Sequence, residues 1–126
     1  MKQRTSYLFA TGVLVVVIVY LLYRYAINGF LYISGDEAKA KIAAKEFDTI
    51  VDVRTNMEYN LGHAPGAVHL PTGEIEQKAS SVLPDKTARI LVYCNTGQRA
   101  RAASEQLYSM GYKNVRYIAG TYLSLR

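Results

Sequence analysis

The chain has 126 residues, half of them hydrophobic, a length that suits one globular domain with a single core and makes a second domain unexpected. Its formal net charge of +5 is uneven, because Lys2, Arg4 and Arg24 flank one uncharged apolar run while the rest of the chain carries 12 basic and 10 acidic side chains. Without a basic stripe, this distribution argues against a nucleic-acid-binding surface, and the single cysteine excludes an internal disulfide.

The apolar run extends from Tyr7 to about Ala26 and follows a short basic tail. Its length suits one helical crossing of a bilayer core. Aromatic residues gather at its far end, where they suit the headgroup region: Tyr20, Tyr23, Tyr25, Phe30 and Tyr32. We therefore expect residues 1–27 to form an uncleaved transmembrane anchor, contacting the membrane through residues 7–26, and residues 28–126 to form one domain. The only candidate linker lies near Asn28 and Gly29.

Two alternatives for the apolar run are weaker. A cleaved secretory signal would be unusually long here and lacks a small-x-small cleavage site, and a buried soluble helix would not be apolar on all faces. For the orientation, Lys2, Arg4 and the terminal amine outweigh Arg24, although Lys39 and Lys41 partly offset them. This balance favours an inside N-terminus, with the domain on the outer, periplasmic or extracytoplasmic, face.

Beyond the anchor, short β-rich runs alternate with amphipathic helical patterns. The predicted strands are Leu31 to Ile33, Thr49 to Val53, Ala67 to Leu70, Ile90 to Tyr93 and Val115 to Ile118. Four helices are predicted between these strands. The first begins at the capping pattern of Ser34 and Glu37, the second ends at Gly62, the third ends at Pro84, and the fourth runs from Arg99 to a cap at Gly111. This alternation predicts an α/β fold with a mainly parallel central sheet flanked by helices, in which ligands bind at the carboxyl ends of the strands.

Cys94 occupies the turn between the strand Ile90 to Tyr93 and the helix that begins at Arg99. At such a turn, backbone N–H groups, the positive end of the helix and the charge of Arg99 all favour thiolate over thiol. Gly97 suits a position where the backbone turns sharply. A lone cysteine after a buried strand is otherwise a small hydrophobic residue, but these neighbours favour a nucleophile combined with an anion cradle.

Two motifs carry a resemblance to a known family. They read Val51-Asp52-Val53-Arg54, Glu58-Tyr59 and Gly62-His63-Ala64-Pro65-Gly66-Ala67, then Cys94-Asn95-Thr96-Gly97-Gln98-Arg99-Ala100. In this order and spacing, the chain from about Tyr32 onward resembles a single-domain rhodanese, a sulfurtransferase, and is similar to the small exported bacterial rhodaneses of the phage-shock type. Four residues separate Cys94 from Arg99, as in the sulfurtransferase branch, whereas related phosphatases have five.

The resemblance implies that Cys94 is the catalytic residue. Its thiolate would attack the outer sulfur of a small sulfur-containing anion such as thiosulfate, and the resulting persulfide would pass its sulfur to a thiol or to cyanide. The resemblance assigns donor binding to the backbone N–H groups of the loop, from Asn95, Thr96, Gly97, Gln98, Arg99 and Ala100. It implies no cofactor. The alternatives are a membrane-tethered persulfide carrier or partner-binding module with little turnover, and a phosphatase.

We expect the charged residues of the first motif to be scaffold. Arg54 and Glu58 are four apart and can pair, Asp52 can accept backbone N–H groups, and His63 can tie its loop through its ring. Neither His63 nor His69 has partners at metal-ligand spacing, so we expect no metal. Arg99 is expected to contact the donor anion rather than solvent, and Arg101 to lie at the rim or in water.

Three departures from the family pattern affect packing rather than the nucleophile. Ala64 stands where the family usually has isoleucine, which predicts some lost packing at a turn. Thr121 follows Gly120 where a second glycine is usual, and Arg126 stands short of a common aromatic ending. These two differences predict a less completely closed pocket edge.

Overall fold

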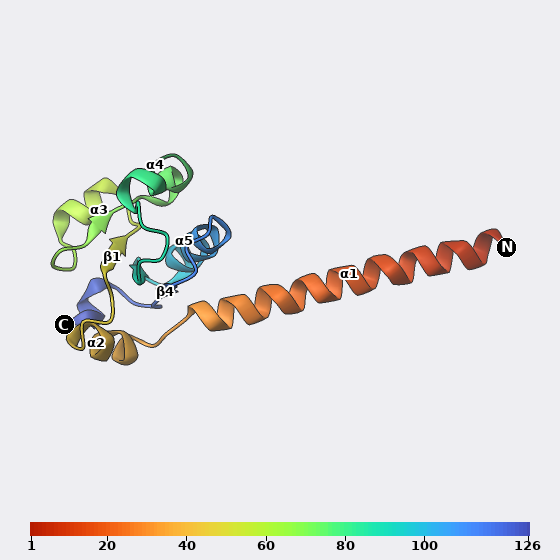
Figure 1. Ribbon diagram of the computed structural model, residues 1–126, viewed down its shortest axis with the longest axis horizontal. Helices are drawn as coiled ribbons and strands as arrows, with labels where there is room; N and C mark the ends of the chain where they lie inside the picture. The colour runs from red at the N-terminus through yellow and green to blue at the C-terminus, as the bar shows by residue number, and fades with distance from the viewer.

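A four-stranded parallel sheet forms the centre of the computed structural model, which describes residues 1–126 and every side chain except that of Asn28 (Figure 1). The strands, in their order across the sheet, are β2 (Val68–His69), β1 (Thr49–Asp52), β3 (Ile90–Tyr93) and β4 (Val115–Tyr117). Each lies within a range predicted from the sequence. The α/β prediction with a parallel sheet is confirmed.

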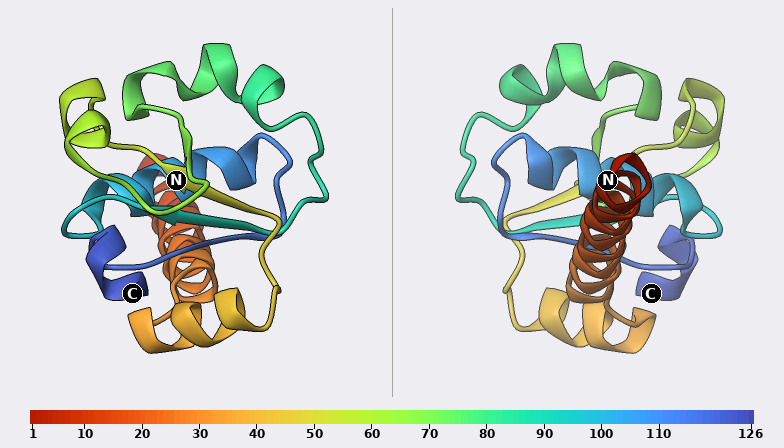
Figure 2. Two further views of the ribbon diagram at one scale, coloured as in Figure 1. Left: turned by 90° about the vertical axis from the view of Figure 1, so that its left-hand side faces the viewer. Right: turned by 90° about the vertical axis from the view of Figure 1, so that its right-hand side faces the viewer.

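Helices cover both faces of this sheet (Figure 2). The helices of the chain are α1 (Lys2–Leu31), α2 (Gly35–Ala43), α3 (Asn56–Leu61), η1 (Thr72–Glu74), α4 (Ile75–Val82), α5 (Gln98–Ser109) and η2 (Tyr122–Leu125). Alternate residues of β3 face opposite ways, as the pleat requires. Ile90 and Val92 join the core under α4 and α5, whereas Leu91 and Tyr93 join a second core cluster under α2 and η2. The site-bearing strand β3 is therefore buried on both faces.

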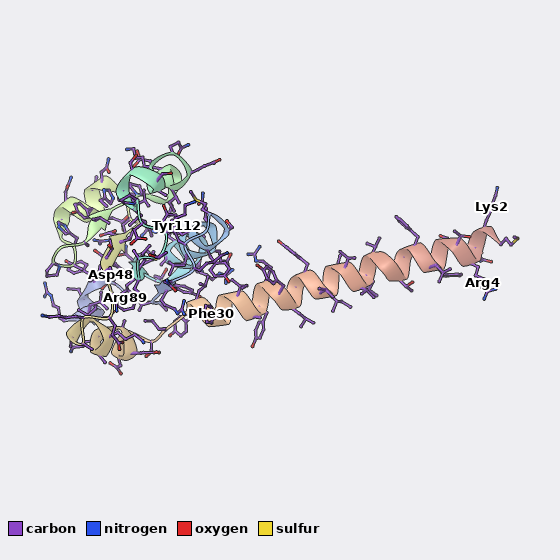
Figure 3. All side chains as sticks on the ribbon, viewed as in Figure 1. Lys2, Arg4, Phe30, Asp48, Arg89 and Tyr112 are labelled. Atoms are coloured by element: carbon purple, nitrogen blue, oxygen red, sulfur yellow. The ribbon has the colours of Figure 1, made fainter. Side chains whose placement is uncertain are left out.

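Helix α1 leaves the domain and carries Lys2 and Arg4 to its far end (Figures 1 and 3). Its 30 residues are long and apolar enough to cross a membrane. The helix continues through the linker predicted at residues 28 and 29, so that prediction is wrong. Leu31, in its last turn, is fully buried in the core under α4 and α5. The long helix thus ends inside the domain rather than in a flexible connection.

The strand predicted at Leu31 to Ile33 is also wrong. Leu31 is helical, and only a single parallel bridge joins Tyr32 to Tyr117 of β4, next to a hydrogen bond from Ile33 N–H to the Tyr117 carbonyl. The reason lies in the adjacent cap, since Ser34 is extended and accepts the Glu37 N–H at the start of α2. Between the end of one helix and the cap of the next, too few residues remain for a strand.

The pairing of the two central strands positions the site. Asp52 at the end of β1 lies opposite Tyr93 at the end of β3. The residues that follow these two strands therefore emerge at the same edge of the sheet. This register brings the Arg54 to Glu58 segment against the loop that begins at Cys94, although Cys94 lies 36 positions after Glu58 in the sequence.

Candidate active site

Cys94 follows β3 directly and is only 1% exposed. The backbone N–H groups of Gly97 and Ala100 donate to its Sγ at 3.1 and 3.3 Å. Helix α5 begins at Gln98, so its positive end also lies at the sulfur. Two of the six loop positions predicted to supply amides thus surround the sulfur with donors, an arrangement suited to holding negative charge there.

Gly97 forms the sharp turn of this loop, and the sulfur transfer that the family resemblance implies should fall by about 10- to 100-fold in Gly97→Ala. Its φ of +98° is strained for any residue with a Cβ, and an added Cβ would lie 2.7 Å from the Cα of Ala119. The loop must therefore shift, and the N–H groups of Gly97 and Ala100 lose their aim at the sulfur. Steady-state rates of thiocyanate formation measure the effect.

The matched control for this substitution is Gly73→Ala. Gly73 lies in η1 with no atom near the position of an added Cβ. This variant should retain wild-type rates. Transfer by Gly97→Ala within twofold of the wild type would show that the loop amides do not need this backbone conformation.

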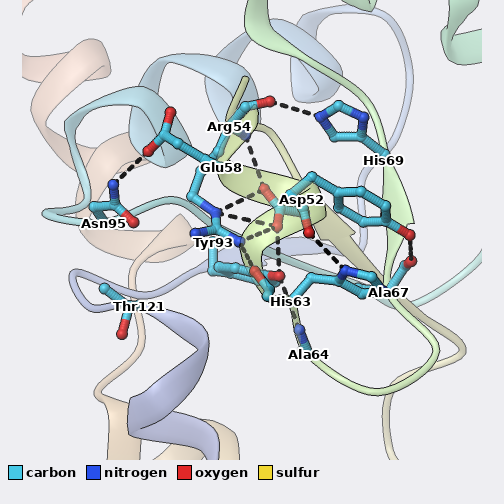
Figure 4. Close-up of polar contacts among 12 residues, drawn as sticks. Asp52, Arg54, Glu58, His63, Ala64, Ala67, His69, Tyr93, Asn95 and Thr121 are labelled. Carbon is cyan, nitrogen blue, oxygen red and sulfur yellow. Dashed lines mark hydrogen bonds and ion pairs between the residues drawn. The ribbon is translucent and has the colours of Figure 1, made fainter. Parts of the chain in front are cut away.

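Glu58 of α3 binds two side chains of the loop that follows Cys94. Its carboxylate accepts from Arg99 Nη1 and Nη2 at 2.7 and 3.0 Å. It also accepts from Asn95 Nδ2 at 2.5 Å (Figure 4). Glu58 also completes a capping box with Thr55 at the start of α3. The pairing predicted between Arg54 and Glu58 is wrong, because Arg54 precedes the helix and turns the other way. The sequence predicted that Arg99 contacts the donor anion rather than solvent, and it did not predict the observed contact with Glu58.

Asp52 and Arg54 form a buried ion pair beneath the site (Figure 4). Arg54 Nε and Nη2 donate to the Asp52 carboxylate at 2.7 to 3.1 Å, and the Arg54 N–H donates to it at 2.9 Å. This last contact confirms that Asp52 accepts a backbone N–H. Nη2 also donates to the Gly62 carbonyl at 2.6 Å. The network ties the end of β1 to the turn after α3.

The Tyr93 hydroxyl extends this network. It donates to Asp52 at 2.6 Å and accepts the Ala64 N–H at 3.0 Å. Burial is the largest cause that raises the pKa of Tyr93. The hydroxyl therefore stays protonated, as its role as a donor requires. The residue before Cys94 therefore ties the end of β3 to two segments of the first motif through one side chain.

Two histidines, His63 within the first motif and His69 two residues after it, serve the scaffold. The rings of His63 and His69 stack on Tyr59, with centroids 3.8 and 4.4 Å away. His63 Nδ1 lies 2.8 Å from the Tyr59 carbonyl, which confirms that its ring ties the loop, and His69 Nε2 lies 2.7 Å from the Arg54 carbonyl. Both rings thus fix the path of the chain from α3 to β2.

The residues that depart from the family pattern pack against neighbouring parts of the domain. Ala64 is buried in the cluster under α2 and η2. Thr121 caps η2 by accepting the Leu123 N–H, and the ring of Tyr122 in the same turn lies 5.2 Å from the Arg54 guanidinium. The C-terminal segment therefore contributes an aromatic wall next to the buried ion pair.

Comparison with known proteins decides the family. A model described as a rhodanese-like domain matches residues 34–125. The chain belongs to the rhodanese-like family. Thiosulfate sulfurtransferase PspE of Escherichia coli is 36% identical over 70 residues, which are 56% of this chain and 67% of PspE. A putative sulfur carrier protein of Bacillus subtilis, YrkF, is 35% identical over 83 residues, which are 66% of this chain but only 44% of YrkF.

A solved structure gives the same fold. The human single-domain sulfurtransferase TSTD1 superposes with a TM-score of 0.65 and is 26% identical, with 75% of this chain and 93% of that chain covered. The rhodanese-like domain here is thus similar both to proteins named as enzymes and to one named as a carrier.

Sequence reasoning about this rhodanese-like domain missed the tyrosines that support the site. Tyr93 was assigned only to an apolar strand, and Tyr59 and Tyr122 received no role in the site. A signal was present, because a buried tyrosine hydroxyl needs a hydrogen-bond partner and Tyr93 directly precedes Cys94. Which partner it finds depends on the register of β1 against β3.

Proposed function

We propose that this chain is a sulfurtransferase that moves a sulfane sulfur from thiosulfate or a similar donor to a thiophilic acceptor through a persulfide on Cys94. The observation that supports this most directly is the pair of N–H groups, from Gly97 and Ala100, that donate to Sγ. The four-residue spacing between Cys94 and Arg99 makes a small ring, suited to a sulfur atom rather than to a phosphate.

The proposed reaction has two displacement steps. The Cys94 thiolate attacks the outer sulfur of thiosulfate, the S–S bond breaks, and sulfite leaves with the bonding pair. The terminal persulfide sulfur keeps a negative charge, which the loop amides from Asn95 to Ala100 stabilise. Cyanide or a cellular thiolate then attacks that sulfur and restores the Cys94 thiolate. No electron acceptor and no cofactor take part.

Turnover tests this proposal. With thiosulfate and cyanide, the full chain should form many equivalents of thiocyanate with ping-pong kinetics, and mass spectrometry should find one added sulfur atom on Cys94 in the absence of acceptor. Hydrolysis of an aryl phosphate at a comparable rate would instead support a phosphatase.

A persulfide carrier is the second candidate, favoured by the similarity to a protein named as a putative sulfur carrier. A carrier would acquire the same sulfur on Cys94 but release at most one equivalent to cyanide. The ratio of thiocyanate to protein therefore separates the two functions. A ratio that stays at or below one would replace the enzyme proposal with the carrier proposal.

We further propose that α1 anchors the domain in a membrane, with the domain on the outer face. Support comes from the length of the helix, the exposed apolar side chains along it, and the two cationic residues Lys2 and Arg4 at its far end. The observed N-terminus of the membrane-bound protein tests the anchor against a cleaved signal. Protease added to spheroplasts with an intact inner membrane tests the orientation, because only a domain on the outer face is digested.

A further inference from the structure

Arg99 is the cation nearest in sequence to the nucleophile, and its charge is already offset. Two parallel contacts, at 2.7 and 3.0 Å, join its guanidinium to the Glu58 carboxylate. Such a bidentate pair fixes the orientation of the guanidinium as well as neutralising it. Hydrogen bonding to Glu58 is the largest cause that raises the pKa of Arg99, and the charge of Cys94 also raises it, so the pair and the sulfur interact electrostatically.

Glu58 keeps its negative charge under ordinary conditions. Hydrogen bonds from Arg99 first, and then from Thr55 and Asn95, hold the pKa of this carboxyl well below its usual range. The ion pair is also rigid, because the same carboxylate caps α3. A donor molecule thus meets a fixed ion pair and not a free arginine.

The second arginine near the site supplies no free charge either. Arg54 is buried against Asp52, with contacts down to 2.7 Å. Attraction of a donor anion then rests on the partial charges of the loop amides and of the α5 N-terminus. An ion pair attracts a distant charge weakly, since its two fields nearly cancel, whereas the cost of removing an anion from water rises steeply with its charge. A second negative charge on the donor therefore brings a penalty without a matching gain.

We infer that Glu58 is a specificity-determining residue that offsets Arg99 and so favours singly charged sulfur donors, such as the persulfide of a small uncharged thiol, over doubly charged thiosulfate. This inference rests on the proposed transfer through Cys94. The Cys94 thiolate attacks the outer sulfur of R–S–S⁻, the S–S bond breaks, and R–S⁻ leaves while the transferred sulfur keeps its negative charge on Cys94. Charge and electrons balance without an oxidant or reductant.

The test compares two donors on the full chain: thiosulfate and the persulfide of 2-mercaptoethanol. Mass spectrometry follows loading of Cys94 against donor concentration, which yields the apparent KM and the maximal loading rate for each donor. In Glu58→Gln the KM for thiosulfate should fall about tenfold, because Arg99 becomes free to attract the second charge, while the KM for the persulfide should change less than about threefold. Adding Arg99→Gln to Glu58→Gln should remove the gain.

Two further variants separate charge from shape. Glu58→Asp keeps the carboxylate and should keep the wild-type ratio of the two KM values. Glu46→Gln removes an exposed carboxylate that pairs with Lys41 away from the site and should change neither donor. A Glu58→Gln protein that misfolds would lose loading from both donors together. In that case Glu58→Asp still tests the role of charge, because a changed ratio of the two KM values in this variant would contradict it.

Each outcome decides a different question. If neither donor loads Cys94 in the wild type, the proposed transfer fails and this inference with it. If both donors load but Glu58→Gln leaves the ratio of KM values unchanged, or lowers both equally, only the specificity role of Glu58 fails.

Discussion

Replacing Cys94 by serine is expected to lower thiocyanate formation from thiosulfate and cyanide by at least about 10³-fold. A serine hydroxyl is not ionised near neutral pH and cannot form the disulfide-like bond that carries the sulfur. The N–H groups of Gly97 and Ala100 remain in place to bind the donor, since they belong to the backbone. Donor binding should therefore survive while transfer is lost. Steady-state rates and the mass of the protein after incubation with thiosulfate measure the loss of transfer, and titration calorimetry with thiosulfate measures donor binding.

The unfolding transition supplies the control for this variant. Serine is smaller than cysteine and can accept the same two N–H groups, so the Cys94→Ser protein should unfold close to the wild type. A folded serine variant that retains even a tenth of the wild-type turnover would exclude a Cys94 persulfide as the obligatory intermediate.

The loop could be predicted from the sequence because its geometry is local. A buried strand, a glycine three residues after Cys94 and a helix start are all read from consecutive residues, and they imply a turn whose amides face the sulfur. The contact between Glu58 and Arg99 is different, because it joins residues 41 positions apart. Rules of helical spacing paired Glu58 with Arg54 instead. Only the register of β1 against β3 decides between these partners.

The extent of α1 shows the same division between local and tertiary information. Composition predicted an apolar helix from residue 7 to about 26, but not its continuation to Leu31. That continuation depends on Leu31 packing in the core and on Arg24 pairing with Glu105 of α5 at 2.7 Å. Glu105 lies in the distant C-terminal half of the chain, and the core that Leu31 joins is built from residues between Val51 and Tyr117. Local propensity therefore located the helix, and tertiary contacts decided where it ends.

Arg54→Met is expected to lower the free energy of unfolding by about 3–5 kcal/mol, the largest stability loss among these substitutions. It leaves the carboxylate of Asp52, which is fully buried, without its cation. The Tyr93 hydroxyl and one backbone N–H remain as donors and cannot neutralise the charge. The variant also loses the hydrogen bond to the Gly62 carbonyl. Denaturant unfolding of the full chain in detergent measures the loss.

A double variant and a surface pair make this prediction specific. Adding Asp52→Asn to Arg54→Met removes the stranded charge and keeps an acceptor for the Tyr93 hydroxyl, so it should recover most of the stability. Arg89→Met breaks the ion pair between Arg89 and Asp48, in which both side chains are about half exposed. Its effect on the free energy of unfolding should be small because water screens that pair. Equal losses from Arg54→Met and Arg89→Met would contradict the burial argument. If the double variant proved less stable than Arg54→Met alone, the cost would come from lost contacts and not from an unpaired charge beneath the Cys94 loop.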